Sequence, residues 1–345
     1  MLKIGVICPS EIALRRFMPA LEKTKNIEFV GVGVYSIIER FGKSANKENK
    51  SQIDTISNEY QKATKFVEQY GGKIFNSYQS IIESKEIDAI YIPLPPALHY
   101  KWAKMALKNN KHVLIEKPST TNNTDCKKLV KLAKKKNLAL HENYMFVFHN
   151  QIKAVNEIIE SKEIGDVRLY RVSFGFPRRL VNDFRYNKAL GGGALIDAGG
   201  YTLKYASILL GEKSQLKFAK MNYCEGEEVD IYGSGVMCDK NGCTAQISYG
   251  MDNDYKCELE VWGSKGTLVT NRILTAPANY IPTVVIRKNN VEEVFDLPED
   301  DSFYKSIQYF LECIGNTEVR RKSYQEIEKQ SKLVACFRKL AKINN

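Results

Sequence analysis

The chain has 345 residues, of which 43% are hydrophobic and 26% are charged, and its formal net charge is +11 at pH 7. This composition excludes a disordered, collagen-like or disulfide-stapled protein, and the length suits about two domains that each bury a core. The longest apolar runs, such as residues 87–96, are too short to cross a bilayer. A strand pattern begins at residue 3 with no signal peptide before it, so we expect a cytoplasmic protein with no membrane partner.

The eight cysteines and the excess of basic residues point to no special chemistry. No two cysteines form a CxxC pair, and none is spaced with a histidine as a zinc site requires, so we expect reduced, buried cysteines and no metal. The lysine runs at 127–128 and 134–136 fall on expected helix faces and are not interleaved with aromatic residues, which argues against a nucleic-acid partner. The charge indicates only a preference for anionic ligands.

The first third of the chain alternates short apolar runs with helical segments. The expected strands are 3–8, 29–35, 89–93 and 112–115. The expected helices are 10–24, a segment that ends near Tyr70 before Gly71-Gly72, and 77–84, 98–109 and 123–136, with an exposed polar insertion at 42–57. Strands that alternate with helices form a parallel sheet covered on both faces. We therefore expect a doubly wound dinucleotide-binding (Rossmann) domain over residues 1–122.

The second part of the chain has a different pattern. Expected helices at 150–161 and 195–210 flank a strand at 167–174 and a loop at 175–193. Seven further β segments follow, at 216–224, 230–238, 243–250, 256–262, 266–270, 283–288 and 291–297. Helices at 303–314 and 323–343 close the chain. We expect an α+β domain over 123–345, with one large, mostly antiparallel sheet that carries helices on a single face.

The turn after the first strand fits a dinucleotide only in part. Backbone that approaches a pyrophosphate at a helix N-terminus needs small residues, and the usual later glycines are replaced by Cys8 and Ser10. Both residues are small, and Ser10 can cap the helix and donate to phosphate, although an ordinary strand–turn–helix fits the same residues. The candidate cofactor residues of this turn are Gly5, Cys8, Pro9, Ser10, Glu11 and Ile12.

The end of the second strand favours NADP over NAD. Tyr35-Ser36 offers no acidic residue to bind a ribose 2′-hydroxyl, whereas Ser36, Arg40 and Lys43 can receive a 2′-phosphate. Basic residues are common in loops, so NAD remains an alternative.

A charged pair follows the strand at 112–115. Glu116-Lys117 lies at the carboxyl end of a buried strand, where doubly wound sheets bind ligands, and a structural salt bridge is the alternative. Two more stretches complete a pattern, Pro93-Leu94-Pro95-Pro96-Ala97-Leu98-His99 and Gly191-Gly192-Gly193-Ala194-Leu195-Ile196-Asp197-Ala198-Gly199-Gly200-Tyr201. In this order, and over essentially the whole chain, they resemble the glucose–fructose oxidoreductase, inositol dehydrogenase and MocA (Gfo/Idh/MocA) family. The resemblance implies a Rossmann domain, a second α+β domain and an NAD(P)-dependent oxidoreductase of a sugar.

Within that family the sequence looks most similar to sugar-nucleotide 3-ketoreductases of deoxysugar pathways. Residues 12–21, 142–149 and 183–186 carry this similarity. It implies NADPH-dependent reduction of a keto-sugar nucleotide at C3. Two alternatives stay open: a dehydrogenase of a free sugar or polyol, and a non-catalytic sensor that binds the dinucleotide as a signal.

The resemblance also assigns roles to matching positions. Lys117 would hydrogen-bond the reacting oxygen and stabilise a developing alkoxide. Many members have His at the position of Tyr201, and a phenol with a pKa near 10 favours proton donation to a carbonyl. Asp197, one helical turn earlier, would orient this acid or bind sugar hydroxyls. Tyr201 as a packed helix aromatic is the alternative.

The other candidate residues follow from the same resemblance. For the cofactor they are Pro93, Leu94, His99, Glu116, Lys117 and Asn143, and for the substrate they are Tyr144, Phe146, Arg178, Arg185, Tyr186, Asp197 and Tyr201. The arginines suit phosphate oxygens but are also common in exposed loops. Lys204 departs from the family pattern and would meet a diphosphate or point to solvent. A residue such as His99 is more often structural than catalytic. Family members form homodimers or homotetramers, and an open sheet face needs cover.

Overall fold

The computed structural model describes residues 1–343, which fall into two compact units. The first unit comprises residues 1–120, 124–143 and 306–328, and the second comprises 121–123, 144–305 and the chain from residue 329 onward. The last two residues of the expected 123–345 domain lie outside the described part of the chain. No helix in that described part is long and apolar enough to cross a membrane.

The first unit is built on a six-stranded parallel sheet in the order β3-β2-β1-β4-β5-β6. Its strands are β1 (Leu2–Ile7), β2 (Ile27–Gly33), β3 (Lys73–Phe75), β4 (Ala89–Ile92), β5 (His112–Glu116) and β6 (Leu140–Asn143). The order reverses between β1 and β4, and doubly wound sheets bind ligands beyond the carboxyl ends of their strands at such a point. The expected Rossmann sheet is confirmed, with β3 and β6 added.

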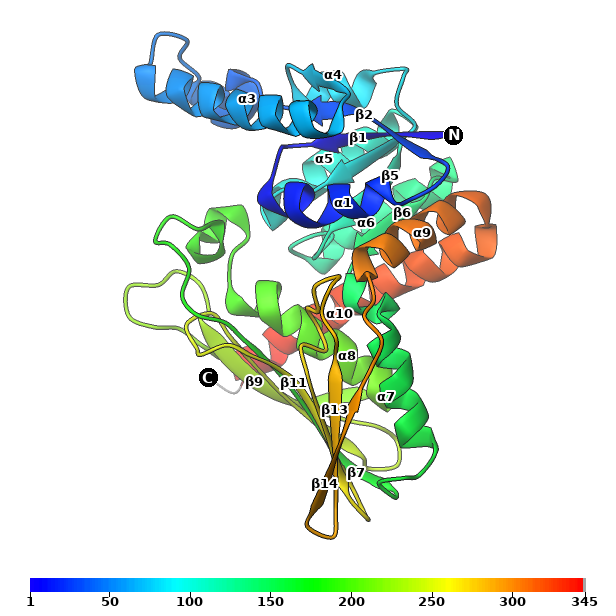
Figure 1. Ribbon diagram of the computed structural model, residues 1–345. Helices are drawn as coiled ribbons and strands as arrows, with labels where there is room; N and C mark the ends of the chain where they lie inside the picture. The colour runs from blue at the N-terminus through cyan, green and yellow to red at the C-terminus, as the bar shows by residue number, and fades with distance from the viewer. Residues whose placement is uncertain (344–345) are drawn as a thin grey trace. The chain divides into compact units, whose positions relative to one another are not determined.

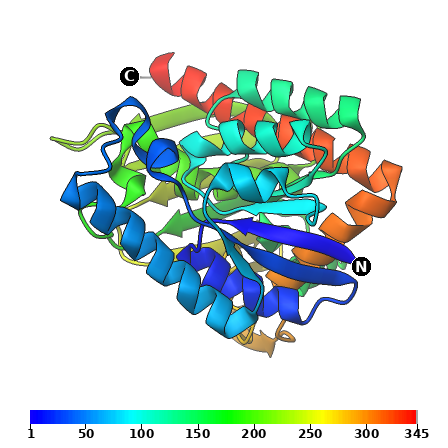
Figure 2. The same cartoon turned by 90° about the horizontal axis from the view of Figure 1, so that it is seen from above.

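Helices cover both faces of this sheet (Figures 1 and 2). They are α1 (Met18–Glu22, after a π-helical turn at Ala13–Phe17), α2 (Ile37–Phe41), α3 (Lys50–Tyr70), α4 (Tyr78–Glu83), α5 (Pro96–Lys108) and α6 (Asn123–Lys136). Helices α4, α5 and α6 bury a cluster that includes Ile81, Trp102 and Leu129. The expected insertion at 42–57 is irregular only in its first half, because Asn49 caps α3 at its start.

The sequence predicts a domain boundary between residues 122 and 123. The two compact units of the structure are not divided at that point. Helix α6 and strand β6 belong to the first unit because β6 pairs with β5 throughout its length. The C-terminal helices α9 (Ser302–Gly315) and α10 (Thr317–Ile343) also return to it in part, since Tyr324 and Ile327 of α10 join its core.

The second unit contains an eight-stranded sheet in the order β14-β13-β12-β11-β7-β10-β9-β8. The strands are β7 (Val167–Gly175), β8 (Gln215–Asn222), β9 (Tyr232–Cys238), β10 (Thr244–Gly250), β11 (Lys256–Gly263), β12 (Thr267–Asn271), β13 (Thr283–Lys288) and β14 (Val291–Asp296). Only β7 and β10 pair in parallel, so the expected mostly antiparallel sheet is confirmed.

The two faces of this second sheet differ in character. Along β10, Ala245, Ile247 and Tyr249 are buried while Gln246 and Ser248 between them are exposed. The buried face lies against α8 (Gly200–Leu210), which packs on β7, β9 and β10. Alternate burial of this kind is what a sheet covered on one face requires.

The eight cysteines are all free thiols. Cys126, Cys257 and Cys313 are buried, as expected, but Cys336 is exposed and the other four are half-buried. The expectation of buried cysteines is therefore wrong for five positions. At Cys336 the reason is that α10 is amphipathic and buries its neighbours Val334 and Phe337 instead.

Candidate active site

The turn after β1 places a cysteine in a left-handed backbone conformation. Cys8 has φ 77°, its N–H donates to the Gly33 carbonyl at 2.9 Å, and its own carbonyl accepts from the Ser10 N–H at 2.8 Å. A glycine is usual in so tight a turn, and an L-residue there costs about 1–2 kcal/mol. Burial and the nearby Glu59 carboxylate raise the pKa of the Cys8 thiol, so it is protonated and unreactive at neutral pH.

The remaining candidates of this turn have separate places. Ser10 caps the following helix, because its Oγ accepts from the Ala13 N–H at 3.2 Å. Glu11 is exposed and forms an ion pair with Arg15. Gly5 lies inside β1, where an added Cβ would meet Ile81 and Ile87 methyls at 2.9 Å, so its smallness serves the packing of α4 on the sheet. Pro9 is buried and Ile12 is exposed.

Ser36 begins α2 at the carboxyl end of β2. Its Oγ accepts from the Glu39 N–H at 3.3 Å, and the Glu39 carboxylate accepts in return from the Ser36 N–H at 2.8 Å. The Ser36 hydroxyl hydrogen is therefore still able to donate to a ligand. Arg40 stacks its guanidinium 5.3 Å from the centre of the Tyr35 ring. A hydroxyl and a guanidinium at this strand end fit a phosphate better than a ribose hydroxyl.

At the carboxyl end of β5, Glu116 is held by neighbours from the adjacent strands. Tyr91 of β4 and Asn143 of β6 both donate to its Oε1, at 2.7 and 2.6 Å. Burial raises the pKa of the Glu116 carboxyl, while these hydrogen bonds and the charge of Lys117 act in the opposite direction. The Glu116-Lys117 pair is thus built into the sheet, with Asn143 as a structural partner of the carboxylate.

His99 joins the loops that follow β4 and β5. Its ring is fully buried, with Nδ1 2.7 Å from the Pro118 carbonyl oxygen and Nε2 2.7 Å from the Leu94 carbonyl oxygen. Burial lowers its pKa to about 4. Each ring nitrogen faces a backbone carbonyl oxygen, and a neutral imidazole donates to only one of them, so the His99 ring is hydrogen-bonded within these loops, which include Pro93 and Leu94.

In the second unit, three consecutive glycines lead into the helix that carries Asp197 and Tyr201. Gly191 ends the preceding turn with φ 79°. A Cβ on Gly192 would lie 2.3 Å from the Arg185 carbonyl oxygen, and one on Gly193 (φ 117°) would lie 2.5 Å from the Asp230 Oδ1. The Asp230 Oδ2 accepts from the Leu195 N–H at 2.7 Å, and burial raises the pKa of Asp230 to about 6. Asp230, which no sequence motif marks, satisfies the first turn of this helix.

The Asp197 carboxylate forms an ion pair with an arginine of the same unit. The Arg185 Nε donates to its Oδ2 at 2.6 Å, and the Arg185 Nη1 reaches Asp183 at 3.1 Å. Burial works to lower the pKa of Arg185, but the two carboxylates outweigh it and raise that pKa. Arg178 forms an ion pair with Glu227. The expected phosphate ligands Arg178 and Arg185 are thus both held by carboxylates here.

Tyr201 lies in an aromatic cluster on α8. Its ring centre is 5.2 Å from that of Tyr144, 5.5 Å from that of Phe174 and 5.8 Å from that of Phe146, and its hydroxyl donates to the Met145 sulfur at 3.8 Å. Tyr144 and Phe146 are buried, so they flank the phenol as packing partners.

Two further aromatic rings of the second unit each lie beside a basic side chain. Lys204 is only 8% exposed and places its ammonium 5.4 Å from the centre of the Tyr144 ring, which excludes the solvent-facing alternative. Tyr186 is stacked by the Arg178 guanidinium at 4.7 Å and donates from its hydroxyl to the Met251 carbonyl at 3.1 Å.

Comparison with known proteins matches both parts of the chain. Residues 25–144 match the oxidoreductase family model with an NAD-binding Rossmann fold, and residues 152–269 match the Gfo/Idh/MocA C-terminal domain. The chain belongs to the Gfo/Idh/MocA oxidoreductase family. The expected fold class and family are confirmed. No group of three or more His, Cys, Asp or Glu side chains gathers as metal ligands within residues 1–343.

Several members of the family are similar over nearly the whole chain. The dTDP-3,4-didehydro-2,6-dideoxy-α-D-glucose 3-reductase of Actinomadura kijaniata is 33% identical, over 98% of this chain and 95% of that protein. A reductase of the same name from Streptomyces violaceoruber is 34% identical over 91% of this chain and 85% of its own. The solved 3-ketoreductase from A. kijaniata, in complex with NADP and TDP-benzene, superposes with a TM-score of 0.88 over 98% of this chain and 97% of that chain, at 33% identity.

The left-handed backbone conformation of Cys8 predicts different outcomes for two substitutions at this position. Cys8→Gly should retain NADPH affinity, because glycine adopts the observed φ freely. Cys8→Val should lower the free energy of unfolding by about 2 kcal/mol and weaken NADPH binding, since a β-branched residue is strained there. Thermal unfolding and fluorescence titration with NADPH test both. A Val variant as stable as the Gly variant would contradict the expected strain.

The position of Gly193, just before the helical segment that leads into α8, predicts a second difference in the free energy of unfolding between two variants. Gly193→Ala should lower the free energy of unfolding by about 2–3 kcal/mol, because the methyl group meets the Asp230 carboxylate and the backbone has φ 117°. The matched control is Gly211→Ala, which has φ 79° but nothing within 4 Å of the added carbon and should cost only about 1 kcal/mol. Equal losses in urea unfolding would show that the contact with Asp230 does not matter.

Proposed function

We propose that this protein is an NADPH-dependent reductase of a keto-sugar nucleotide, reducing a ring ketone, at C3 of a nucleoside-diphosphate keto-deoxysugar. The observation that carries this proposal is similarity over nearly the full length. Four relatives, 30–34% identical over 90–98% of this chain, are all named dTDP-3,4-didehydro-2,6-dideoxy-α-D-glucose 3-reductase. A substrate class shared by four relatives over nearly the whole chain is a stronger guide to function than the fold alone, because one fold serves many functions.

Three side chains would carry the chemistry of this reaction. Lys117 would stabilise the negative charge that develops on the substrate oxygen, and Tyr201 would donate the proton that completes the alcohol. Asp197, fixed by Arg185 at 2.6 Å, would orient the substrate hydroxyls or the phenol. Solved variants of the A. kijaniata 3-ketoreductase replace a lysine and a tyrosine that are separated by the same number of residues as Lys117 and Tyr201, which supports this assignment.

The cofactor assignment rests on the first unit. NADPH supplies the hydride when it is bound. The Ser36 hydroxyl and the Arg40 guanidinium would receive the 2′-phosphate, and the Ser10-capped turn would face the pyrophosphate. A solved structure of the A. kijaniata 3-ketoreductase contains NADP, which supports the same preference.

The test is NADPH consumption, followed by absorbance, with a panel of 3-keto and 4-keto nucleotide sugars. Lys117→Ala should lower kcat by about 10²–10³ and Tyr201→Phe by about 10²–10⁴, because each removes a group used in the transition state. The control Tyr205→Phe lies one helical turn away and removes a buried hydroxyl with no hydrogen-bond partner in the described chain, so it should leave kcat unchanged.

Three results would revise the proposal. Unchanged turnover in Tyr201→Phe would remove the phenol from the chemistry. Production of reduced cofactor from a free sugar or polyol would favour the dehydrogenase alternative. A protein that binds NADPH but turns over none of these substrates would favour the sensor.

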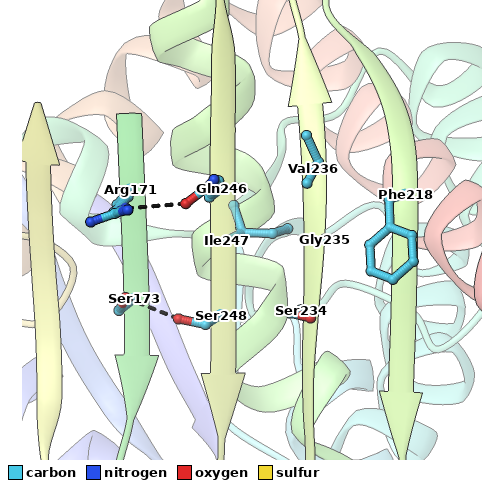
Figure 3. A pocket seen from close by; sticks show the side chains of 9 residues that line it. All are labelled: Arg171, Ser173, Phe218, Ser234, Gly235, Val236, Gln246, Ile247 and Ser248. Atoms are coloured by element: carbon cyan, nitrogen blue, oxygen red, sulfur yellow. Dashed lines mark hydrogen bonds between the residues drawn. The ribbon is translucent and has the colours of Figure 1, made fainter. Parts of the chain in front are cut away.

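We also propose that the protein forms a homodimer or homotetramer through the open face of the second sheet. This face holds a shallow hollow of about 310 Å³ lined by β7, β8, β9 and β10 (Figure 3). Small hydroxyls lie across it, with Ser248 donating to Ser173 at 2.9 Å, and Phe218 and Trp262 are exposed beside them. Apolar surface on a sheet without helices gains by being covered, and a second copy of the same face would cover it.

A charge placed on this face should prevent self-association. Phe218→Glu should shift the protein to monomer in light scattering, because it would bury a carboxylate without a partner. The control Ile38→Glu changes an equally apolar, 67% exposed residue on α2 and should leave the mass unchanged. A wild type that is monomeric at all concentrations would overturn the assignment.

A further inference from the structure

A chain of hydrogen bonds inside the first unit links α9 to the carboxylate beside Lys117. The His141 Nε2 lies 2.8 Å from the Ser306 Oγ, and the Ser306 hydroxyl donates to the Asn143 Oδ1 at 2.7 Å. The Asn143 Nδ2 then donates to the Glu116 Oε1 at 2.6 Å. Ser306 is 163 residues beyond Asn143 in the sequence and is buried.

The chemistry of these groups gives the chain one direction. The Asn143 Nδ2 lies on Glu116 and its Oδ1 lies on Ser306, the orientation that an ionised carboxylate, which only accepts, requires. That oxygen also only accepts, so the Ser306 hydroxyl must donate to it. A hydroxyl has a single hydrogen, and His141 must therefore donate to Ser306 from a protonated Nε2. Each hydrogen bond from His141 through Ser306 and Asn143 is therefore donated in the direction of Glu116.

The surroundings of the chain are fixed as well. The Tyr91 hydroxyl donates to the same oxygen of Glu116 at 2.7 Å, and the His141 ring packs edge-on against Tyr309 with ring centres 5.1 Å apart. The neighbouring Glu142 accepts from the Ser119 N–H at 2.6 Å. In buried networks of this kind a misplaced donor is costly, because no water replaces it.

We infer that Ser306 is a positioning residue for catalysis: its hydroxyl fixes the amide of Asn143, and so keeps Glu116 an ionised acceptor beside Lys117. This inference rests on the proposed reductase function. Without the hydroxyl, the amide of Asn143 is free to turn its oxygen toward Glu116, where only a protonated carboxyl could meet it. The negative charge that Glu116 places next to Lys117 would then be lost.

Turnover with NADPH tests the role of Ser306. Ser306→Ala should lower kcat about tenfold while the Kd for NADPH stays within a factor of two, a loss typical of removing a partner that orients a catalytic group. Ser306→Thr should restore most of the rate because it keeps the hydroxyl. The control is Ser323→Ala, which removes an equally buried hydroxyl that donates to the Leu140 carbonyl of the same strand at 2.9 Å. If Ser306→Ala and Ser323→Ala lose the same activity, the inference is overturned.

The direction of the chain can be measured without any turnover. The protein has only four histidines, so ¹⁵N spectra of selectively labelled protein resolve each ring, and His141 is assigned by comparison with a His141→Asn variant. A hydrogen on the His141 Nε2 supports the chain, and a bare Nε2 overturns it. An inert wild type with the expected His141 signal would contradict the proposed function and leave the hydrogen-bond chain standing.

Discussion

A carboxylate removed from water must receive hydrogen bonds or an opposite charge, and both units are arranged around this requirement. In the first unit, Glu116 takes donors from β4 and β6, and Asn143 in turn takes one from Ser306 of α9. A helix near the end of the chain is thereby tied to the strand ends of the nucleotide-binding sheet. The charge beside Lys117 and the return of the C-terminal segment are thus parts of one arrangement.

The second unit meets the same requirement in two places. Asp230 accepts from the backbone at the start of the helix that carries Tyr201, and Asp197 within that helix is paired with Arg185. Gly192 lets the chain approach Arg185, and Gly193 lets it approach Asp230, more closely than any side chain allows. Two acidic groups therefore lie at this helical segment, one accepting from the backbone at its start and one paired with an arginine. The aromatic cluster around Tyr201 then holds the phenol by packing.

Much of the fold could be predicted because periodicity and turn residues are local. Strands β1, β4 and β5 are runs of apolar residues, and α6 shows helical periodicity. Strand β6 was not predicted because three of its four residues, His141, Glu142 and Asn143, are polar. The strand is buried because the side chains of His141 and Asn143 form hydrogen bonds with other segments. The division into compact units could not be predicted because part of α10 packs in the core of the first unit, far away in the sequence.

By itself the sequence determined the alternation of strands and helices and the family, since motifs and periodicity are readable from neighbouring residues. Tertiary structure decided which polar groups face one another. It paired Arg185 with Asp197, placed the His99 ring between two backbone carbonyls, and joined Ser306 to Asn143. Such pairings depend on directional bonds between segments distant in the chain, and no local pattern encodes them.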